Sequence, residues 1–257
     1  MILFTYSSIY HECIWREVHK FAHQYLSCII KEVSVCNPSV TCTMPSVSPL
    51  PIEVVDLFCG IGGLSYGLSL AGLDVVSGYD LDKTCAYAYE SNTGAKFFYQ
   101  DISKLEADEV LRQYSTEGIR ILAGCAPCQP FSSYASKYDL LYEFGRIIKE
   151  VKPHIVTMEN VPQIVAFREK DVLGDFVNLL ESQGYRVSVS VVYCPDYGIP
   201  QTRKRLVLLA SRLGDITLLP PTNKPEEYVT TADVIGSLPK LTAEKLTLVI
   251  PFTEQKR

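Results

Sequence analysis

The sequence predicts a doubly wound α/β fold, in which a mostly parallel sheet of seven strands is covered by helices on both faces. From residue 52 onward, short apolar runs alternate with segments whose apolar residues recur at helical spacing, which is the pattern of successive β–α units. The chain has 257 residues, 47% of them hydrophobic, so it can bury a large core without disulfides or a metal ion. The same apolar content excludes disorder over most of the chain.

The expected strands are continuous apolar runs, which are typical of parallel strands covered on both faces. The first, Ile52–Phe58, ends just before Cys59-Gly60. Because no helix is expected between the last two strands, we expect these two to pair antiparallel at one edge of the sheet. The remaining strands are expected at Val75–Tyr79, Ala95–Tyr99, Ile119–Ala123, Ile155–Met158, Tyr185–Tyr193 and Leu206–Ala210.

Each of the first five strands is followed by an expected helix. The fourth helix ends because Pro153 cannot continue it, and the fifth is capped at its C-terminal end by Gly184. The helices are expected at Leu64–Ala71, Lys83–Ser91, near Leu105–Tyr114, Leu140–Val151 and Val172–Ser182.

The two ends of the chain differ from this regular middle. Residues 1–51 hold four of the nine cysteines, three of the four histidines and the single tryptophan, and we expect an N-terminal extension there that ends in a proline-rich linker. Met44 lies just before the first strand, so we expect translation to start there and residues 1–43 not to be native. Residues 212–257 carry five prolines and a weak helix near Thr231–Ser237.

Composition and the N-terminus indicate a protein of a reducing cytoplasm. The cysteines are odd in number and several lie in apolar runs, which does not suit a disulfide framework. No lysine or arginine precedes Arg16, and no apolar run approaches the ~18 residues that span a membrane, so neither secretion nor membrane insertion is expected. A formal charge of -5 does not indicate a strongly basic surface, although a small basic groove is compatible with it.

The turn Asp56-Leu57-Phe58-Cys59-Gly60-Ile61-Gly62-Gly63 indicates a site for a nucleoside-bearing cofactor. Glycines between a strand and a helix let a ligand approach the backbone closely. Asp80, at the end of the second strand, can accept hydrogen bonds from ribose hydroxyls. A dinucleotide and S-adenosylmethionine (SAM) both fit, but Ser65 stands where a dinucleotide motif has its third glycine. The alternative interpretation is a tight structural turn beside a solvated acid.

Three further polar motifs accompany later strands. Cys125 and Cys128 form a C-x-x-C after the fourth strand, which fits a redox pair, zinc ligands or two buried thiols. Glu159 directly follows the fifth strand, where a carboxylate can act as an acid or cap a turn. Arg203 and Arg205 enter the last strand and, by alternation, face the same side, which suits a carbonyl, carboxylate or phosphate group.

In this order and spacing, the four motifs resemble those of the C5-cytosine-specific DNA methyltransferases over about residues 52–240. The resemblance implies a Rossmann-like, SAM-binding catalytic domain at residues 52–211, with 212–257 as the start of a target-recognition region. The implied cofactor-binding residues are Asp56, Phe58, Cys59, Gly60, Ile61, Gly62, Gly63, Asp80, Leu81, Asp101, Ile102 and Pro127. The implied catalytic residues are Cys128, Glu159, Arg203 and Arg205, and the implied substrate-binding residues are Gln129, Ser132, Asn160, Val161 and Gln201. No metal site is implied.

The resemblance also implies a mechanism in which these residue types are needed together. A Cys128 thiolate adds to carbon 6 of cytosine, which makes carbon 5 nucleophilic toward a methyl group. Glu159 assists at ring nitrogen N3, while Arg205, helped by Arg203, holds the O2 carbonyl. A cytosine stacked in double-stranded DNA is out of reach, so the base must be flipped out.

Three departures from the family pattern shape the expectation. Ala126 stands where a proline is usual, and the segment Phe131–Leu140 is shorter than the family's mobile loop. The sequence ends where the recognition region begins, so the two family motifs that follow that region are absent. We therefore expect a fragment of a longer gene, a truncated inactive relic, or one half of a split enzyme that a second polypeptide completes.

The expected function is that of a DNA (cytosine-5-)-methyltransferase of restriction-modification type, acting on double-stranded DNA in the cytoplasm and, in a bacterium, at the nucleoid. One alternative is an inactive fragment or a non-catalytic subunit that needs a partner. A tRNA cytosine-5 methyltransferase is another. A nicotinamide oxidoreductase leaves Cys128, Glu159 and the two arginines unexplained.

Overall fold

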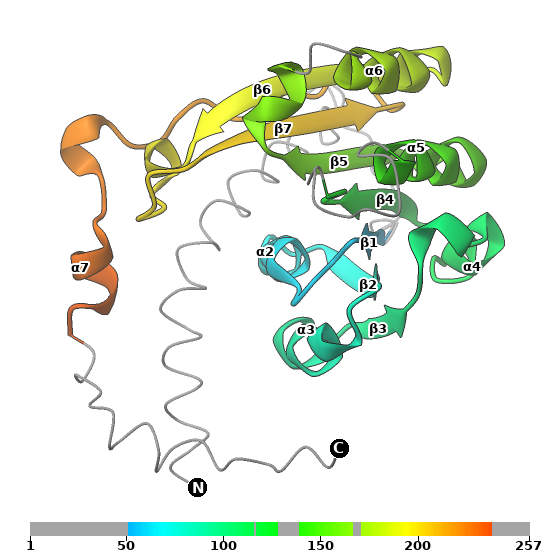
Figure 1. Ribbon diagram of the computed structural model, residues 1–257, viewed down its shortest axis with the longest axis horizontal. Coiled ribbons are helices and arrows are strands. Elements are labelled where there is room, and N and C mark those ends of the chain that lie inside the picture. The colour runs from blue at the N-terminus through cyan, green and yellow to red at the C-terminus, as the bar shows by residue number, and fades with distance from the viewer. Residues whose placement is uncertain (1–50, 116, 128–138, 167–170, 238–257) are drawn as a thin grey trace, which may run out of the picture.

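The computed structural model describes residues 51–115, 117–127, 139–166 and 171–237, which form a single seven-stranded sheet with helices on both faces (Figure 1). The order of the strands is β3-β2-β1-β4-β5-β7-β6. The mostly parallel α/β sheet that the sequence predicts is thereby confirmed. The strands are β1 (Ile52–Leu57), β2 (Asp74–Asp80), β3 (Lys96–Tyr99), β4 (Ile119–Gly124), β5 (Ile155–Asn160), β6 (Arg186–Tyr193) and β7 (Lys204–Ser211).

The first five strands run parallel, and the last two form the antiparallel pair that was expected. Strand β7 lies between β5 and β6 and is antiparallel to both, so β6 forms the edge. Pairing with β7 also extends β5 beyond the expected end at Met158, because Glu159 lies opposite Val207 and Asn160 opposite Leu206. Glu159 therefore belongs to the strand, rather than following it.

The helices divide between the two faces as the right-handed β–α–β rule requires (Figure 1). Helices α2 and α3 pack on one face around Leu68 and Tyr89, and α4, α5 and α6 pack on the other around Phe144 and Phe176. Their bounds, with that of a further helix in the C-terminal part, are α2 (Gly63–Leu70), α3 (Ala86–Thr93), α4 (Ala107–Leu111), α5 (Asp139–Val151), α6 (Val172–Ser182) and α7 (Thr231–Ile235).

Two helices are shorter than the sequence pattern indicated. Asp82 accepts a hydrogen bond from the Thr84 backbone N–H, and this local bond favours a 3-10 turn at Lys83–Cys85 before α3 begins. Asp101 caps a similar turn at Ile102–Lys104, and α4 starts only at Ala107. Such short polar side chains compete with regular helix at these points, which hydrophobic spacing does not reveal.

After β7, the described residues pass through the 3-10 turn Pro225–Glu227 to α7, and they contact a second 3-10 turn, Cys194–Tyr197, which lies between β6 and β7. Backbone N–H groups of Thr222 and Asn223 donate to the Asp196 carbonyl, and the Tyr228 hydroxyl bonds to the Asp196 carboxylate. The weak helix expected near Thr231–Ser237 is present as the short α7, whose first turn is capped by Thr230. Within the ranges described above, no helix is both long and apolar enough to cross a membrane. The predictions for residues 1–50 lie outside those ranges.

Candidate active site

Parallel pairing brings the predicted motifs to one edge of the sheet. Leu57 of β1 lies opposite both Tyr79 of β2 and Gly124 of β4, and Gly124 lies opposite Met158 of β5. The glycine-rich turn, Asp80, the residues after β4 and Glu159 therefore share the carboxyl edge of the strands. Ligands of open α/β sheets bind at this edge.

The turn after β1 has a backbone that few side chains allow. Phe58, Gly60 and Gly62 have φ angles of 59°, 52° and 89°, in the left-handed region. A non-glycine residue there is uncommon and marks local strain, which is frequent at functional sites. A Cβ at Gly60 would meet nothing within 4 Å, so the backbone of the turn is open on that side. Helix α2 begins at the end of the turn, and Gly62 provides no side-chain cap for it.

Asp80 fixes the turn in place. One of its carboxylate oxygens accepts the Gly60 N–H at 2.8 Å, and the other accepts the Asp82 N–H at 2.9 Å. Sequence reasoning predicted only that Asp80 would face a ribose. Each carboxylate oxygen has two lone pairs, so both oxygens can still accept a hydroxyl from a ligand.

A buried polar chain lies beneath the turn. The Ser65 hydroxyl donates to Asp56 at 2.6 Å and lies 3.0 Å from the Tyr89 hydroxyl. Burial raises the pKa of Asp56 to about 7, against the hydrogen bond from Ser65. Neither Ser65 nor Tyr89 was predicted as a site residue. The missing third glycine at position 65 was the one signal that pointed to Ser65.

Asp101 and Ile102, predicted as cofactor-binding residues, differ in exposure. Asp101 uses one carboxylate oxygen to cap the turn that follows it, accepting from the Ser103 N–H and hydroxyl. Ile102 is 3% exposed and packs in the core, so its side chain offers almost no surface to a ligand. Leu81 and Ile61, in contrast, are 60% and 48% exposed at this edge of the sheet.

Glu159 and Arg205 form an ion pair between the end of β5 and the start of β7. They meet because an antiparallel strand begins where its neighbour ends. The Arg205 side chain is 13% exposed and that of Glu159 is 32% exposed, so water screens the pair only in part. Arg205 also donates to the Lys204 carbonyl at 2.9 Å, which fixes its guanidinium group further.

Burial raises the pKa of Glu159 above its ordinary value, against the charge of Arg203 and a hydrogen bond from the Cys125 thiol. Two of the other predicted motifs, those of Arg203 and Cys125, therefore act on this carboxylate. Cys125 was predicted only as half of a C-x-x-C pair, so its contact with Glu159 is a finding of the structure.

Asn160 and Val161 hold the backbone around this carboxylate. The Asn160 side chain is buried, and its amide donates to the Ala126 carbonyl at 3.1 Å. Its oxygen accepts the Val161 N–H at 2.8 Å. Asn160, predicted as a substrate contact, thus joins β5 to the segment that follows β4. Pro127, next in that segment, is exposed.

The turn before β7 carries Gln201 and Arg203, both exposed. The Gln201 N–H donates to the Ile199 carbonyl, and the Arg203 N–H donates to the Gln201 carbonyl, each at 2.7 Å. These short-range bonds fix the backbone while leaving both side chains free to meet a substrate. Cys128, Gln129 and Ser132, predicted as nucleophile and substrate contacts, lie outside the described residues.

Comparison with known sequences shows the family to which the chain belongs. A sequence model described as C-5 cytosine-specific DNA methylase matches residues 52–257. The chain belongs to this family. The resemblance inferred from the four motifs is therefore confirmed.

Curated relatives of this chain are named as Type II methylases or methyltransferases. The chain is 50% identical over 191 residues to the Type II methylase M.HgiDII of Herpetosiphon aurantiacus, which covers 72% of this chain and 54% of that protein. It is 32% identical over 196 residues to the Type II methyltransferase M.XorII of Xanthomonas oryzae pv. oryzae, covering 72% of this chain and 46% of that protein. The chain thus spans about half the length of the curated relatives it matches.

Solved structures show the same fold as this methylase chain. A candidate DNA modification methyltransferase encoded within a prophage (E. coli) superposes with a TM-score of 0.65 at 28% identity, covering 74% of this chain and 56% of that chain. S. pombe Dnmt2 methyltransferase superposes with a TM-score of 0.54 at 24% identity, covering 65% of this chain and 50% of that chain. The second likeness is one of fold alone.

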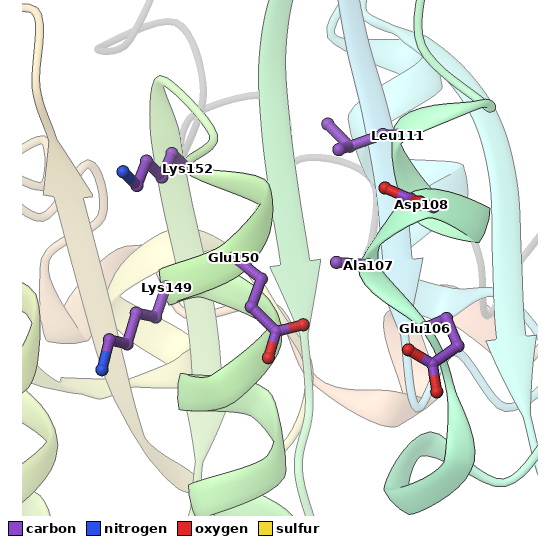
Figure 2. A pocket seen from close by; sticks show the side chains of 7 residues that line it. All are labelled: Glu106, Ala107, Asp108, Leu111, Lys149, Glu150 and Lys152. Carbon is purple, nitrogen blue, oxygen red and sulfur yellow. The ribbon is translucent and has the colours of Figure 1, made fainter.

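A surface groove of about 490 Å³ lies between α4 and the end of α5, away from the methylase motifs (Figure 2). Lys149, Glu150 and Lys152 line one side, and Glu106 and Asp108 line the other. Lys152 lies just before β5 begins, so this side of the groove is at the opposite end of the strand from Glu159. Among the described residues, no group of three or more His, Cys, Asp or Glu side chains is placed to hold a metal ion.

Proposed function

We propose that this chain carries the catalytic region of a DNA (cytosine-5-)-methyltransferase of restriction-modification type, acting on double-stranded DNA. The observation that carries the proposal is the Glu159–Arg205 ion pair at the carboxyl edge of the sheet, beside the segment that leads to Cys128. In this proposal residues 52–211 form the catalytic domain, and residues from 212 onward begin the region that recognises the DNA target.

The residues at the turn after β1 fit SAM. The open backbone at Gly60 and the uncapped start of α2 suit the carboxylate of the methionine part, because the N–H groups of a helix start attract anions. Asp80 can accept ribose hydroxyls while it holds the turn. The exposed Leu81 and Ile61 offer apolar surface to the adenine. When bound, SAM supplies an electrophilic methyl group.

The residues around Glu159 suit activation of a cytosine. The Cys128 thiolate forms a bond to carbon 6 with its own electron pair, and the electrons of the C5=C6 bond move toward carbon 5. Glu159 supplies a proton or hydrogen bond to N3, and its raised pKa suits it to hold that proton. Arg205 fixes the Glu159 carboxyl and, with Arg203, stabilises charge on O2. Once carbon 5 has gained the methyl group, loss of the C5 proton to a base re-forms the C5=C6 bond and expels the Cys128 thiolate. The cytosine must be flipped out of the duplex to reach these groups.

The test is transfer of labelled methyl groups from SAM to mixed-sequence double-stranded DNA, followed by base analysis. We expect label in 5-methylcytosine with the unaltered chain and none with Cys128→Ser. Lys149→Gln, on the remote groove, is the matched surface control and should retain activity. Label on another base, undiminished label with Cys128→Ser, or no label with the unaltered chain would each count against the proposed function.

A further inference from the structure

The ring of Tyr89 fills the space beneath the cofactor turn. Tyr89 is wholly buried in α3. A Cβ at Gly78 of β2 would lie 2.3 Å from its Cζ atom, and a Cβ at Gly62 of the turn would lie 2.9 Å from its Cδ2 atom. Both approaches are closer than real side chains make, so these two glycines admit the ring. Tyr89 is therefore held between the turn and the sheet by contacts on both sides.

The hydroxyl of this ring ends a directed hydrogen-bond chain. Ser65 is wholly buried and has one hydroxyl proton, which it donates to Oδ2 of Asp56 at 2.6 Å. When Asp56 is ionised, the Tyr89 hydroxyl, 3.0 Å from the Ser65 oxygen, must therefore be the donor to Ser65. These hydrogen bonds run from Tyr89 of α3 through Ser65 of α2 to Asp56, the last residue but one of β1. Both hydroxyl protons point toward Asp56.

Asp56 is 1% exposed, and its second oxygen, Oδ1, is buried with no hydrogen-bond partner among the described residues. Asp80, at the end of β2, is a second anion that acts on it. The other titratable groups facing it are the thiols of Cys59 and Cys125 and the hydroxyl of Tyr89, which are all neutral near neutral pH. Among the residues that the structure describes, no cation therefore faces this carboxyl, and burial raises its pKa to about 7.

We propose that Tyr89 and Ser65 are positioning residues that hold the Asp56 carboxyl ready to ionise when a cationic cofactor binds at the turn. The proposal rests on the proposed function, since the cofactor it invokes is SAM or its product, S-adenosylhomocysteine. Both carry an ammonium group, and SAM carries a sulfonium as well. A cation favours the ionised form of a nearby buried carboxyl. By reciprocity, ionisation of Asp56 strengthens cofactor binding.

The experiment measures the affinity of the chain for S-adenosylhomocysteine by calorimetry between about pH 5.5 and 8.5. With one linked proton, affinity should rise with pH by up to about tenfold per unit below the midpoint and level off above it. Asp56→Asn should remove this dependence. Tyr89→Phe keeps the ring and removes only the hydroxyl, so it should move the midpoint to higher pH, and Ser65→Ala should move it further.

A second measurement reads the carboxyl without any ligand. In the chain labelled with carbon-13 at its aspartate carboxyls, one resonance should titrate near pH 7, be absent in Asp56→Asn, and shift upward in Tyr89→Phe and Ser65→Ala. Tyr87→Phe is the matched control, because Tyr87 lies on the same helix and is 74% exposed. It should leave both titrations unchanged.

The outcomes separate the proposal from the proposed function. In one outcome, Tyr89→Phe and Ser65→Ala lose the same affinity at every pH and the midpoint does not move. That result overturns the positioning role and leaves the methyltransferase proposal standing. The same holds if Asp56 titrates near pH 7 but affinity is independent of pH. Failure to bind S-adenosylhomocysteine at any pH overturns the proposed function and, with it, this inference.

Discussion

Replacing Asn160 by alanine should weaken the connection between β5 and the segment that follows β4. The substitution removes the 3.1 Å bond to the Ala126 carbonyl and the 2.8 Å bond from the Val161 N–H. Ala126 is 3% exposed, so its carbonyl would be left buried without this partner, at a cost of about 1–3 kcal/mol. Losing the bond to the half-buried Val161 adds about 1 kcal/mol. We therefore expect the free energy of unfolding to fall by about 3 kcal/mol.

Urea unfolding followed by far-ultraviolet circular dichroism measures this loss. Asn178→Ala, at an exposed position of α6, is the matched control and should change stability by less than about 0.5 kcal/mol. Methyl transfer, measured on the folded variant, should fall by a larger factor than that of Asn178→Ala, because the released segment leads directly to Cys128. A loss of stability below about 0.5 kcal/mol would refute the buried bonds. Full turnover despite the expected loss would refute the need for this connection in catalysis.

Three further predictions concern the pH dependence, packing and charge of the site. Burial raises the pKa of Asp56 from 3.8 to about 7, so its contribution to the free energy of unfolding should be lost as pH rises from about 4 to 7, by about 4 kcal/mol in all. Urea unfolding at a series of pH values should show that stability depends less on pH in Asp56→Asn than in the unaltered chain. Gly78→Ala should destabilise the chain by about 1–3 kcal/mol through the clash with Tyr89, and a double-mutant cycle with Tyr89→Ala should show that most of this cost depends on the ring. Arg205→Ala should lower turnover by about 100-fold or more while cofactor affinity changes by less than about twofold. In the same variant Glu159 loses a neighbouring positive charge, so its pKa should rise and the basic limb of the pH–rate profile should move to higher pH. An unmoved limb would argue against pairing of Arg205 with Glu159 in the active state.

The sheet could be predicted because apolar residues occupy most buried positions of its strands, and the spacing of these runs fixes the alternation with helices. The glycine-rich turn, Asp80 and Cys125 could be placed for the same reason, since each lies at the end of such a run or directly after it. Hydrophobicity could not reveal that β5 continues through Glu159 and Asn160, because their strand conformation depends on pairing with β7, whose partners lie more than 45 residues away in the chain. A pattern read along one segment contains no information about such a partner.

The polar contacts within the site were less predictable than the positions of its residues. Ser65 and Tyr89 are 24 residues apart and meet only because α2 and α3 lie side by side on the sheet. Asn160 and Ile102 were predicted to touch ligands. In the structure the Asn160 side chain binds backbone groups and Ile102 packs in the core, so tertiary packing sets the direction of both side chains. Their contacts with a ligand stay predictions.

The position of β7 between β5 and β6 has a consequence for the order in which the chain assembles. Strands β1 to β5 can complete a continuous sheet on their own as they leave the ribosome, with the cofactor turn already in place. Strand β6 has no partner in that sheet until β7 has been made, because β7 is the strand that it pairs with. The two must therefore join the β5 edge together, as a hairpin. We expect the part of the sheet that carries the glycine-rich turn to form first, and Glu159 to gain Arg205 only in the final docking step.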